Sequence, residues 1–328
     1  MMITAKQAVE LLSDGKVVAV PTETVYGLAA DALNPSAIAK IFEVKNRPAD
    51  NPLICHFHSI EELKNFVKEI PDATSTLMKH FSPGPISFML DLPENSPLKF
   101  ATCGRAQVIV RIPDHPLFLE IISNLNRPAA APSANTSGRV SPTSAEMVEK
   151  DLGGKIDGIV DGGISHFGIE STIVDARSEG EIFILRPGAI GEEEIQKKIP
   201  GTKIISKKIP DLQITPGTQY RHYAPATPVF LINTPDELPE EKITALLLTE
   251  EQLNVIHDTV SRKFNEGEIH FIVLGSVNEL DILAKHFYRN LASLDHLGIS
   301  KAFFLNNDWG DSSLGKALRN RIEKIVSR

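Results

Sequence analysis

The chain has 328 residues, of which 42% are hydrophobic and 23% are charged. This balance supports a packed interior and excludes an intrinsically disordered protein, and the length exceeds the ~250–300 residues at which a single core stops growing. The formal net charge is −8, and residues 1–200 carry 19 Lys and Arg against 26 Asp and Glu, which does not fit a general nucleic-acid binder. We therefore expect two domains, and any basic cluster in the first part needs a local reason such as a bound anion.

Neither a membrane segment nor a metal site is expected. No stretch approaches the ~18 apolar residues that span a bilayer, so we expect a cytoplasmic protein without a membrane partner. Cys55 and Cys103 lie far apart and outside any Cys-x-x-Cys pattern, which argues against a disulfide framework or a thiolate zinc site and favours two buried apolar side chains. His56 and His58 share one strand face, but the sequence places no third ligand beside them, so zinc is not favoured.

The predicted elements begin with a helix after Thr4, because Thr4 and Gln7 form a capping-box pair. A strand over 16–21 follows, and Asn34-Pro35 opens a second helix that leaves Lys45 and Arg47 at its C-terminal end. Further strands are expected over 53–57, 86–90, 108–112, 129–132, 158–160, 172–175 and 182–185, and further helices around 61–68, 116–124 and 144–151. The crossovers are too irregular for a purely parallel winding, so we predict an α/β domain with a twisted mixed sheet and flanking helices.

The remainder of the chain predicts a linker and a second domain. Residues 204–228 are rich in Lys, Pro, Gly and Thr without a sustained apolar period, which is typical of a linker. Short apolar strands over 229–232, 245–248, 270–274 and 302–305 then alternate with helices, the last over 313–326. This pattern predicts a small Rossmann-like parallel α/β domain over 229–328, although it lacks the G-x-G-x-x-G fingerprint.

Polar clusters stand at the ends of several predicted elements, where α/β sheets bind ligands. Each has a plain structural explanation when taken alone. Thr22 and Thr24 suit a strand because they are β-branched. Lys45 and Arg47 complement a helix C-terminus, and the Ser133–Asn135 segment suits a turn.

Taken together, the clusters bring cations and hydroxyls to one acidic domain. The cations are Lys45, Arg47, Arg111 and Arg186, and the hydroxyls are those of Thr24, Ser133, Ser141 and Ser171. Arg offers a bidentate fork to phosphate or carboxylate and Lys a compact charge, so we expect a nucleotide triphosphate and a second, carboxylate-bearing substrate. Mg²⁺ is expected with the triphosphate, and Glu23 or Asp50 would position its waters, without a choice between them.

In this order the motifs resemble the YrdC family, in the longer two-domain form of the threonylcarbamoyl-AMP synthases. The resemblance covers essentially the whole chain, with PTETVYGL at 21–28, KNRP at 45–48, NPL at 51–53, SPGP at 82–85, VRIPDHP at 110–116, APSAN at 131–135, STIV at 171–174, RPG at 186–188 and YRHYAP at 220–225. It implies a YrdC-like catalytic domain over 1–203, a linker or lid over 204–228, and a C-terminal domain over 229–328. The sequence departs from the family pattern at Ser87, where threonine is more usual, and at Arg105–Gln107.

The resemblance also implies an activity and its residues. The reaction is the synthesis of L-threonylcarbamoyl-AMP and pyrophosphate from L-threonine, bicarbonate and ATP, for threonylcarbamoylation of adenosine 37 in tRNA. The implied catalytic residues are Lys45, Arg47, Ser133 and Asn135. The implied threonine site comprises Thr24, His56, Arg111, Ala131 and Ser171. The implied ATP site comprises Lys45, Arg47, Asn51, Gln107, Ser133, Asn135, Ser141, Arg186 and Tyr223.

Two other functions remain open at this point. A double-stranded RNA-binding module would use Lys45, Arg47, Arg105, Arg111 and Arg139 to follow phosphates, although the acidic first part argues against it. A carbamoyltransferase module would need partner domains that this sequence does not contain. tRNA or downstream tRNA-modification proteins are possible partners of the synthase, and the YRHYAP segment is expected to close over the site, with Tyr223 on the nucleotide.

Overall fold

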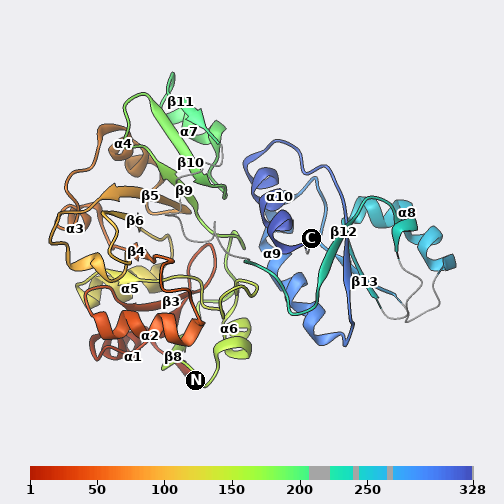
Figure 1. Cartoon of the computed structure of the whole chain (residues 1–328), viewed down its shortest axis with the longest axis horizontal. Helices are drawn as coiled ribbons and strands as arrows, with labels where there is room; N and C mark the ends of the chain where they lie inside the picture. Colours follow the sequence, from red (N-terminus) through yellow and green to blue (C-terminus); the bar gives the residue numbers. More distant parts are fainter. Residues whose placement is uncertain (207–221, 239–243, 264–268, 327–328) are drawn as a thin grey trace. The chain divides into compact units, whose positions relative to one another are not determined.

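The computed structural model describes residues 1–206, 222–238, 244–263 and 269–326. It divides the chain into two compact units, of which the first comprises Met1–Ser137 and Ser141–Tyr220 and the second comprises Gly138–Val140 and Arg221–Arg328 (Figure 1). Three residues from the first half of the chain thus belong to the second unit. The predicted domain limits of 1–203, 204–228 and 229–328 stay a prediction.

The first unit contains a mixed sheet with 11 described strands. In spatial order they are β1 (Met2–Ile3), β8 (Gly158–Val160), β2 (Val18–Val20), β3 (Gly27–Asp31), β7 (Ala129–Ala130), β4 (Ile54–His56), β6 (Gln107–Arg111), β5 (Ile86–Asp91), β9 (Thr172–Asp175), β10 (Glu181–Arg186) and β11 (Lys203–Ile205). Parallel pairs such as β4–β6 and β5–β9 alternate with antiparallel pairs such as β5–β6 and β9–β10. The mixed sheet predicted from the irregular crossovers is confirmed.

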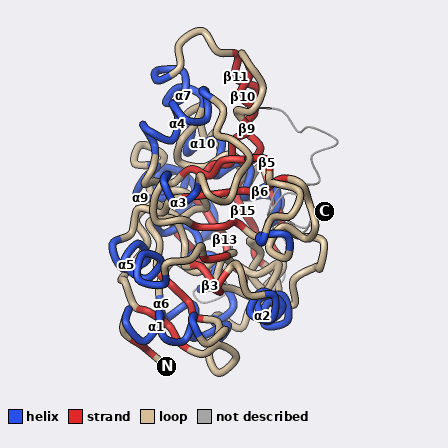
Figure 2. Tube along the Cα trace, turned by 90° about the vertical axis from the view of Figure 1, so that its left-hand side faces the viewer, coloured by secondary structure: helices blue, strands red, loops and turns tan. Residues whose placement is uncertain are grey.

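Helices pack on both faces of this sheet, more of them on one face than on the other, and Figure 2 shows the helices in blue. One face packs against α2 (Pro35–Lys45), α3 (Ile60–Leu63), α4 (Asp72–Phe81), α6 (Ala145–Leu152) and α7 (Glu192–Lys198), through side chains such as Ile41 and Leu77. On the other face, α1 (Ala5–Ser13) and α5 (Pro116–Leu125) pack on the β8–β2–β3–β7 part through Leu12 and Phe118. The apolar clusters that these described helices form do not extend over the second face of β6, β5 and β9.

That second face carries a small apolar strip formed by Ile54, Met89, Ile109 and Ile173. Side chains alternate between the two faces of a strand, so the residue two positions along from each of these lies on the same face. Four such residues are His56, Ser87, Arg111 and Ser171, and all of them lie at one end of the four strands. Strand periodicity therefore gathers polar side chains that are far apart in the sequence.

The second unit contains a parallel four-stranded sheet in the order β12 (Val229–Ile232), β15 (Ala302–Leu305), β13 (Thr244–Leu248) and β14 (Ile269–Val273). Its helices are α8 (Glu250–Lys263), α9 (Leu280–Ser293) and α10 (Ser313–Ile325). The predicted Rossmann-like arrangement of parallel strands is confirmed. Within this unit, Arg139 pairs with Asp295 at 2.8 Å, and the main-chain N–H of Ala224 donates to the carbonyl of Gly138.

Several elements differ from the sequence prediction. The capping box of Thr4 and Gln7 and the N-cap of Asn34 form as expected. The sequence did not predict β1, β3, α4, α7 or β11. Cys55 is buried as predicted, but Cys103 is partly exposed in a turn with φ of 54°, so its assignment to the core is wrong. Among the described residues, no helix is both long and apolar enough to cross a membrane.

Candidate functional site

The loop between β2 and β3 carries the first polar cluster and is fixed by its own threonine. The hydroxyl of Thr22 accepts from the main-chain N–H groups of Thr24 and Val25 at 3.1 and 3.2 Å and donates to the carbonyl of Val25 at 2.7 Å. The main-chain N–H of Phe167 donates to the carbonyl of Glu23. Strand β3 begins only at Gly27, so Thr22 and Thr24 belong to a turn and not to a strand.

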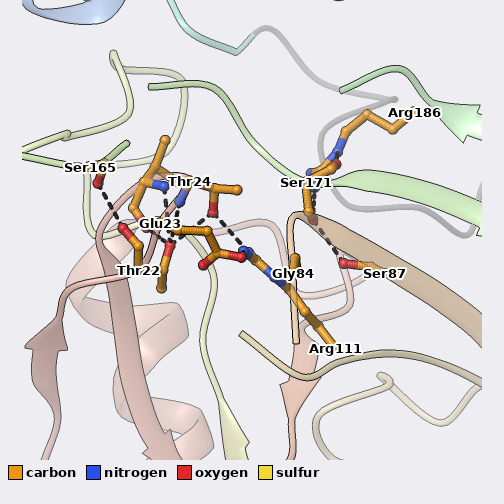
Figure 3. Close-up of polar contacts among 10 residues, drawn as sticks. Thr22, Glu23, Thr24, Gly84, Ser87, Arg111, Ser165, Ser171 and Arg186 are labelled. Carbon is orange, nitrogen blue, oxygen red and sulfur yellow. Dashed lines mark hydrogen bonds and ion pairs between the residues drawn. The ribbon is translucent and has the colours of Figure 1, made fainter. Parts of the chain in front are cut away.

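Arg111, the last residue of β6, lies at the centre of a buried polar network (Figure 3). Its Nη1 donates to the hydroxyl of Thr24 at 2.8 Å, and its Nε donates to the carbonyl of Gly84 at 3.2 Å. Its Nη2 lies 2.5 Å from Oε1 of Glu23, and the side chains of Arg111 and Glu23 are only 5% and 7% exposed. The guanidinium thus faces an anion from the β2–β3 loop in a site with little water.

Two serines and a second arginine form a separate set of hydrogen bonds beside this network (Figure 3). The hydroxyls of Ser87 and Ser171 lie 2.8 Å apart, and both side chains are buried. Nη2 of Arg186 donates to the carbonyl and the hydroxyl of Ser171 at 2.8 and 3.0 Å. We call the set of Glu23, Thr24, Ser87, Arg111, Ser171 and Arg186 the Arg111 cluster.

His56 lies next to Arg111, because the two residues pair in the parallel register of β4 and β6. Its ring packs on Phe118 with centroids 5.3 Å apart, and the side chain is buried. Burial, followed by the nearby Arg111 charge, lowers the pKa of His56 to about 3, so the ring is neutral at physiological pH. His58 does not join it in a metal site, since its Nδ1 lies 2.7 Å from Oε2 of Glu62.

Lys45 ends α2 with a buried ammonium group that is held by main-chain carbonyls. Its Nζ donates to the carbonyls of Ser133 and Asn135, and the residue is 1% exposed. Desolvation, followed by the charge of Arg47, lowers the pKa of Lys45 well below its usual value. The alternative in which Lys45 only complements the helix C-terminus is wrong, because the side chain reaches the Ser133–Asn135 turn instead.

Arg47 holds the turn that follows α2. Its Nε donates to the carbonyl of Asn51 at 2.9 Å, and its Nη2 donates to Oδ1 of Asn51 and to the carbonyl of Pro52 at 2.8 and 2.7 Å. We call the set of Lys45, Arg47, Asn51, Ser133 and Asn135 the Lys45 cluster. An isolated bridge between Gly27 and Ser133 places its 133–135 turn beside the start of β3, next to the loop of the Arg111 cluster.

The remaining predicted residues lie in different parts of the structure. Ala131 is buried and donates its main-chain N–H to the carbonyl of Ile54, and Ser141 donates to Oε1 of Glu170 at 2.6 Å. The side chain of Gln107 donates to Asp91 at the opposite end of β6 from Arg111. Tyr223 belongs to the second unit, where its ring stacks on Tyr288 with centroids 5.7 Å apart. Tyr220 and Arg221 lie outside the described residues.

Sequence reasoning missed three contributions to this site. Glu23 was one of two candidates for positioning magnesium waters, yet it pairs with Arg111. Ser87 was treated as a departure from a family pattern, yet it contacts Ser171. Glu170 was not considered, although it accepts from Ser141. Strand alternation could have found Ser87, because it lies two residues before the inward-facing Met89.

Comparison with known proteins places the chain among relatives of matching length. Residues 10–188 match a family described as Telomere recombination (Sua5/YciO/YrdC), and residues 190–325 match a family described as Threonylcarbamoyl-AMP synthase, C-terminal domain. The chain belongs to the Sua5/YciO/YrdC family. The YrdC resemblance inferred from the motifs is therefore confirmed.

Individual relatives agree with this family membership. Proteins named threonylcarbamoyl-AMP synthase from Pyrococcus abyssi and Bacillus subtilis are 39% and 38% identical to this Sua5/YciO/YrdC chain, over 97% and 98% of it and 92% of each relative. A crystal structure of P. abyssi Sua5 complexed with L-threonine superposes with a TM-score of 0.82 and 34% identity, over 99% of this chain and 96% of that chain. The predicted YrdC-like fold with a C-terminal domain is confirmed.

Proposed function

We propose that the chain is a nucleotidyltransferase that forms L-threonylcarbamoyl-AMP and pyrophosphate from L-threonine, bicarbonate and ATP. The observation that carries this proposal is the match along nearly the full length to two proteins named threonylcarbamoyl-AMP synthase. The buried Arg111 cluster provides a chemical basis for it, since a guanidinium with hydroxyls around it suits an amino-acid carboxylate. The product would serve the threonylcarbamoylation of adenosine 37 in tRNA, and the cytoplasm stays the predicted location.

In this proposal, the Arg111 cluster binds threonine, except for Arg186, which stays a predicted contact of the nucleotide. Arg111 would hold the carboxylate, while Thr24 and Ser171 would contact the remaining polar groups of the substrate. His56 is neutral and packed on Phe118, so it would act as a fixed wall or a neutral hydrogen-bonding group. Ala131, buried beside the end of β4, would complete the threonine side.

The Lys45 cluster would bind ATP beside the threonine. Arg47, with its fork on Asn51, would need to redirect at least one N–H to a phosphate, whereas Lys45 would position the Ser133–Asn135 turn from behind. Ser141, Arg186, Gln107 and Tyr223 stay predicted contacts of the nucleotide. The carbamate oxygen would attack the α-phosphorus with pyrophosphate leaving, a step that positioning and charge neutralisation accelerate without a covalent enzyme intermediate.

Magnesium would enter with the triphosphate. Within the described ranges, no group of three or more His, Cys, Asp or Glu side chains is arranged to hold a metal ion. Of the two predicted water-positioning residues, Glu23 pairs with Arg111, and Asp50 is exposed. This arrangement fits a Mg²⁺ ion that is held mainly by phosphate oxygens and water.

The test is mass spectrometry of the products made from ATP, L-threonine and bicarbonate. We expect threonylcarbamoyl-AMP and pyrophosphate only when all three substrates are present. L-serine is the informative control, because it lacks one methyl group, worth roughly 1–3 kcal/mol in a pocket, and should be a poor substrate. Equal ATP turnover with and without an amino acid contradicts the proposal.

RNA binding without catalysis is not favoured. The first 200 residues are acidic, with 19 basic against 26 acidic side chains, and the relatives that match along the whole chain are named as synthases. A salt titration separates the two functions, because RNA binding weakens steeply with salt whereas threonine-dependent ATP turnover requires no RNA. Direct contact with tRNA or with downstream modification proteins stays a prediction.

A further inference from the structure

The carboxylate of Glu23 is a buried anion with unused hydrogen-bonding capacity. Its side chain is 7% exposed, and neither carboxylate oxygen accepts a hydrogen bond from any residue in the described part of the chain. The 2.5 Å contact with Arg111 is a charge contact without hydrogen-bond geometry. Buried carboxylates normally accept several hydrogen bonds, because desolvation without them is costly. This anion therefore points to a donor that a bound molecule supplies.

The fold holds this carboxylate in a fixed position. The main-chain carbonyl of Glu23 accepts from Phe167 at 2.8 Å, and the carbonyl of Thr22 accepts from the hydroxyl of Ser165 at 3.0 Å. Together with the Thr22 turn, these contacts fix the backbone on both sides of Glu23. Figure 3 shows the carboxylate of Glu23 and the hydroxyl of Thr24 on the same side of the Arg111 guanidinium, with Ser171 and Ser87 on the other.

The two opposite charges of Glu23 and Arg111 match one class of small molecule. An α-amino acid carries its ammonium and its carboxylate on a single carbon atom, so a site that binds both groups needs an anion and a cation side by side. Thr24 and Ser171 add hydroxyls that accept or donate as the ligand requires. His115 is a further titratable side chain near Glu23, and burial lowers its pKa, so it does not supply a competing cation at neutral pH.

We propose that Glu23 binds the ammonium group of the amino-acid substrate and so makes the site specific for amino acids over the corresponding carboxylic acids that lack the amine. The inference rests on the proposed function, since it assumes that threonine binds at the Arg111 cluster. Arg111 then turns toward the substrate carboxylate, and the ammonium becomes the hydrogen-bond donor that Glu23 lacks. Specificity follows because a ligand without the amine leaves the buried carboxylate without a hydrogen-bond donor.

The experiment compares two ligands on two proteins by calorimetry. The ligands are L-threonine and 3-hydroxybutanoate, which is threonine without its amine, and the proteins are wild type and Glu23→Gln. We expect wild type to prefer threonine and the ratio of the two dissociation constants to fall by about 10- to 100-fold in Glu23→Gln, as for loss of a charged hydrogen bond. The matched control is Glu62→Gln, which removes a largely buried carboxylate outside the cluster and should leave the ratio unchanged.

The ratio separates ammonium binding from a purely structural role. If Glu23 only balanced the charge of Arg111, the substitution would change the affinity for both ligands equally, and an unchanged ratio overturns the inference. If wild type binds no threonine, the proposed function itself fails. If Glu23→Gln does not fold, Glu23→Asp replaces it in the same experiment. Aspartate keeps the negative charge next to Arg111, but its side chain is one methylene group shorter. A ratio in folded Glu23→Asp equal to that of wild type would then overturn the inference.

Discussion

The Arg111 cluster and the Lys45 cluster both bury a cation at an element end, but they balance its charge in different ways. Arg111 meets a carboxylate, a hydroxyl and one carbonyl, and most of these groups are side chains. Lys45 meets the main-chain carbonyls of Ser133 and Asn135. Side-chain partners can turn toward a ligand, whereas main-chain partners are fixed by the fold. The difference indicates that the Arg111 cluster is suited to exchanging partners with a substrate and that Lys45 is suited to shaping a turn.

The largest expected effect tests the carboxylate partner of Arg111. Replacing Arg111 by Met leaves Glu23 as an unpaired buried charge, so we expect the free energy of unfolding to fall by about 3–5 kcal/mol and threonine binding to be lost. Urea denaturation and calorimetry measure the two effects. The double variant Arg111→Met with Glu23→Gln should recover most of the stability without recovering threonine binding. A single variant as stable as wild type contradicts the buried ion pair.

A smaller effect is expected at Arg47, in the Lys45 cluster. Arg47→Ala should weaken ATP binding by about 10- to 100-fold, as for loss of a charged hydrogen bond, and should lower the free energy of unfolding by about 1–2 kcal/mol because the turn at Asn51 loses its fork. Arg47→Lys keeps the charge without the fork and should retain part of the ATP affinity. ATP affinity unaltered in the alanine variant would leave Arg47 as a turn-holding residue alone.

The pH dependence of stability tests whether His56, beside Arg111, is neutral in the folded protein. The pKa of His56 is lowered to about 3 in the folded protein, so the unfolded chain binds one more proton below the ordinary value of 6.5. Stability should therefore decrease as pH falls from 6.5 toward about 3, by up to about 1.4 kcal/mol per pH unit. His56→Gln does not titrate and should flatten that part of the curve. Identical slopes for the two proteins in urea denaturation would exclude a neutral buried His56.

The smallest expected effect is at Ser87. Ser87→Ala removes one hydroxyl contact with Ser171, so we expect a loss of about 1 kcal/mol in threonine binding, or roughly a fivefold rise in its dissociation constant. ATP affinity should not change, since Ser87 does not belong to the Lys45 cluster. Gln107→Ala is the converse control, because its side chain contacts Asp91 at the far end of β6. Equal effects of both variants on threonine binding would contradict a specific contribution of Ser87 to the threonine site.

Much of this architecture was predictable from local signals. The cap of Thr4, the Asn34-Pro35 start of α2 and the alternating apolar strands gave elements that the structure contains. β3 was missed because its Gly-Leu-Ala-Ala sequence has low strand propensity and is stabilised by pairing with β2 and β7. Helix α4 was missed because it contains many polar and β-branched residues, so the apolar periodicity of its buried side, which includes Leu77, is weak in the sequence.

The sequence predicted most of the residues that form the site, but it did not predict which of these residues contact each other. Motif order pointed to Thr24, Arg111 and Ser171. The structure joins Arg111 to Thr24 by a hydrogen bond and places Ser171 nearby (Figure 3). Which carboxylate meets which cation depends on strand register and loop conformation, and neither is encoded within one motif. The pair of Glu23 and Arg111 joins a loop residue to the last residue of β6, and Lys45 meets carbonyls about ninety positions away. Such contacts follow only from the folded topology.

Because Gly138–Val140 belong to the second unit, the chain connects the two units more than once. The chain passes between them after residues 137, 140 and 220, so removing the C-terminal part is not equivalent to cutting a single tether. A truncation after Lys203 also strips Arg139 of Asp295 and Gly138 of its bond to Ala224. Those three residues would then lose these two contacts, whereas the flanking Ser137 and Ser141 keep hydrogen bonds within the first unit. A loss of activity on truncation would therefore have two causes, the removal of the linker and the loss of contacts at residues 138–140. Tyr223→Ala changes one side chain and keeps the chain connections between the units.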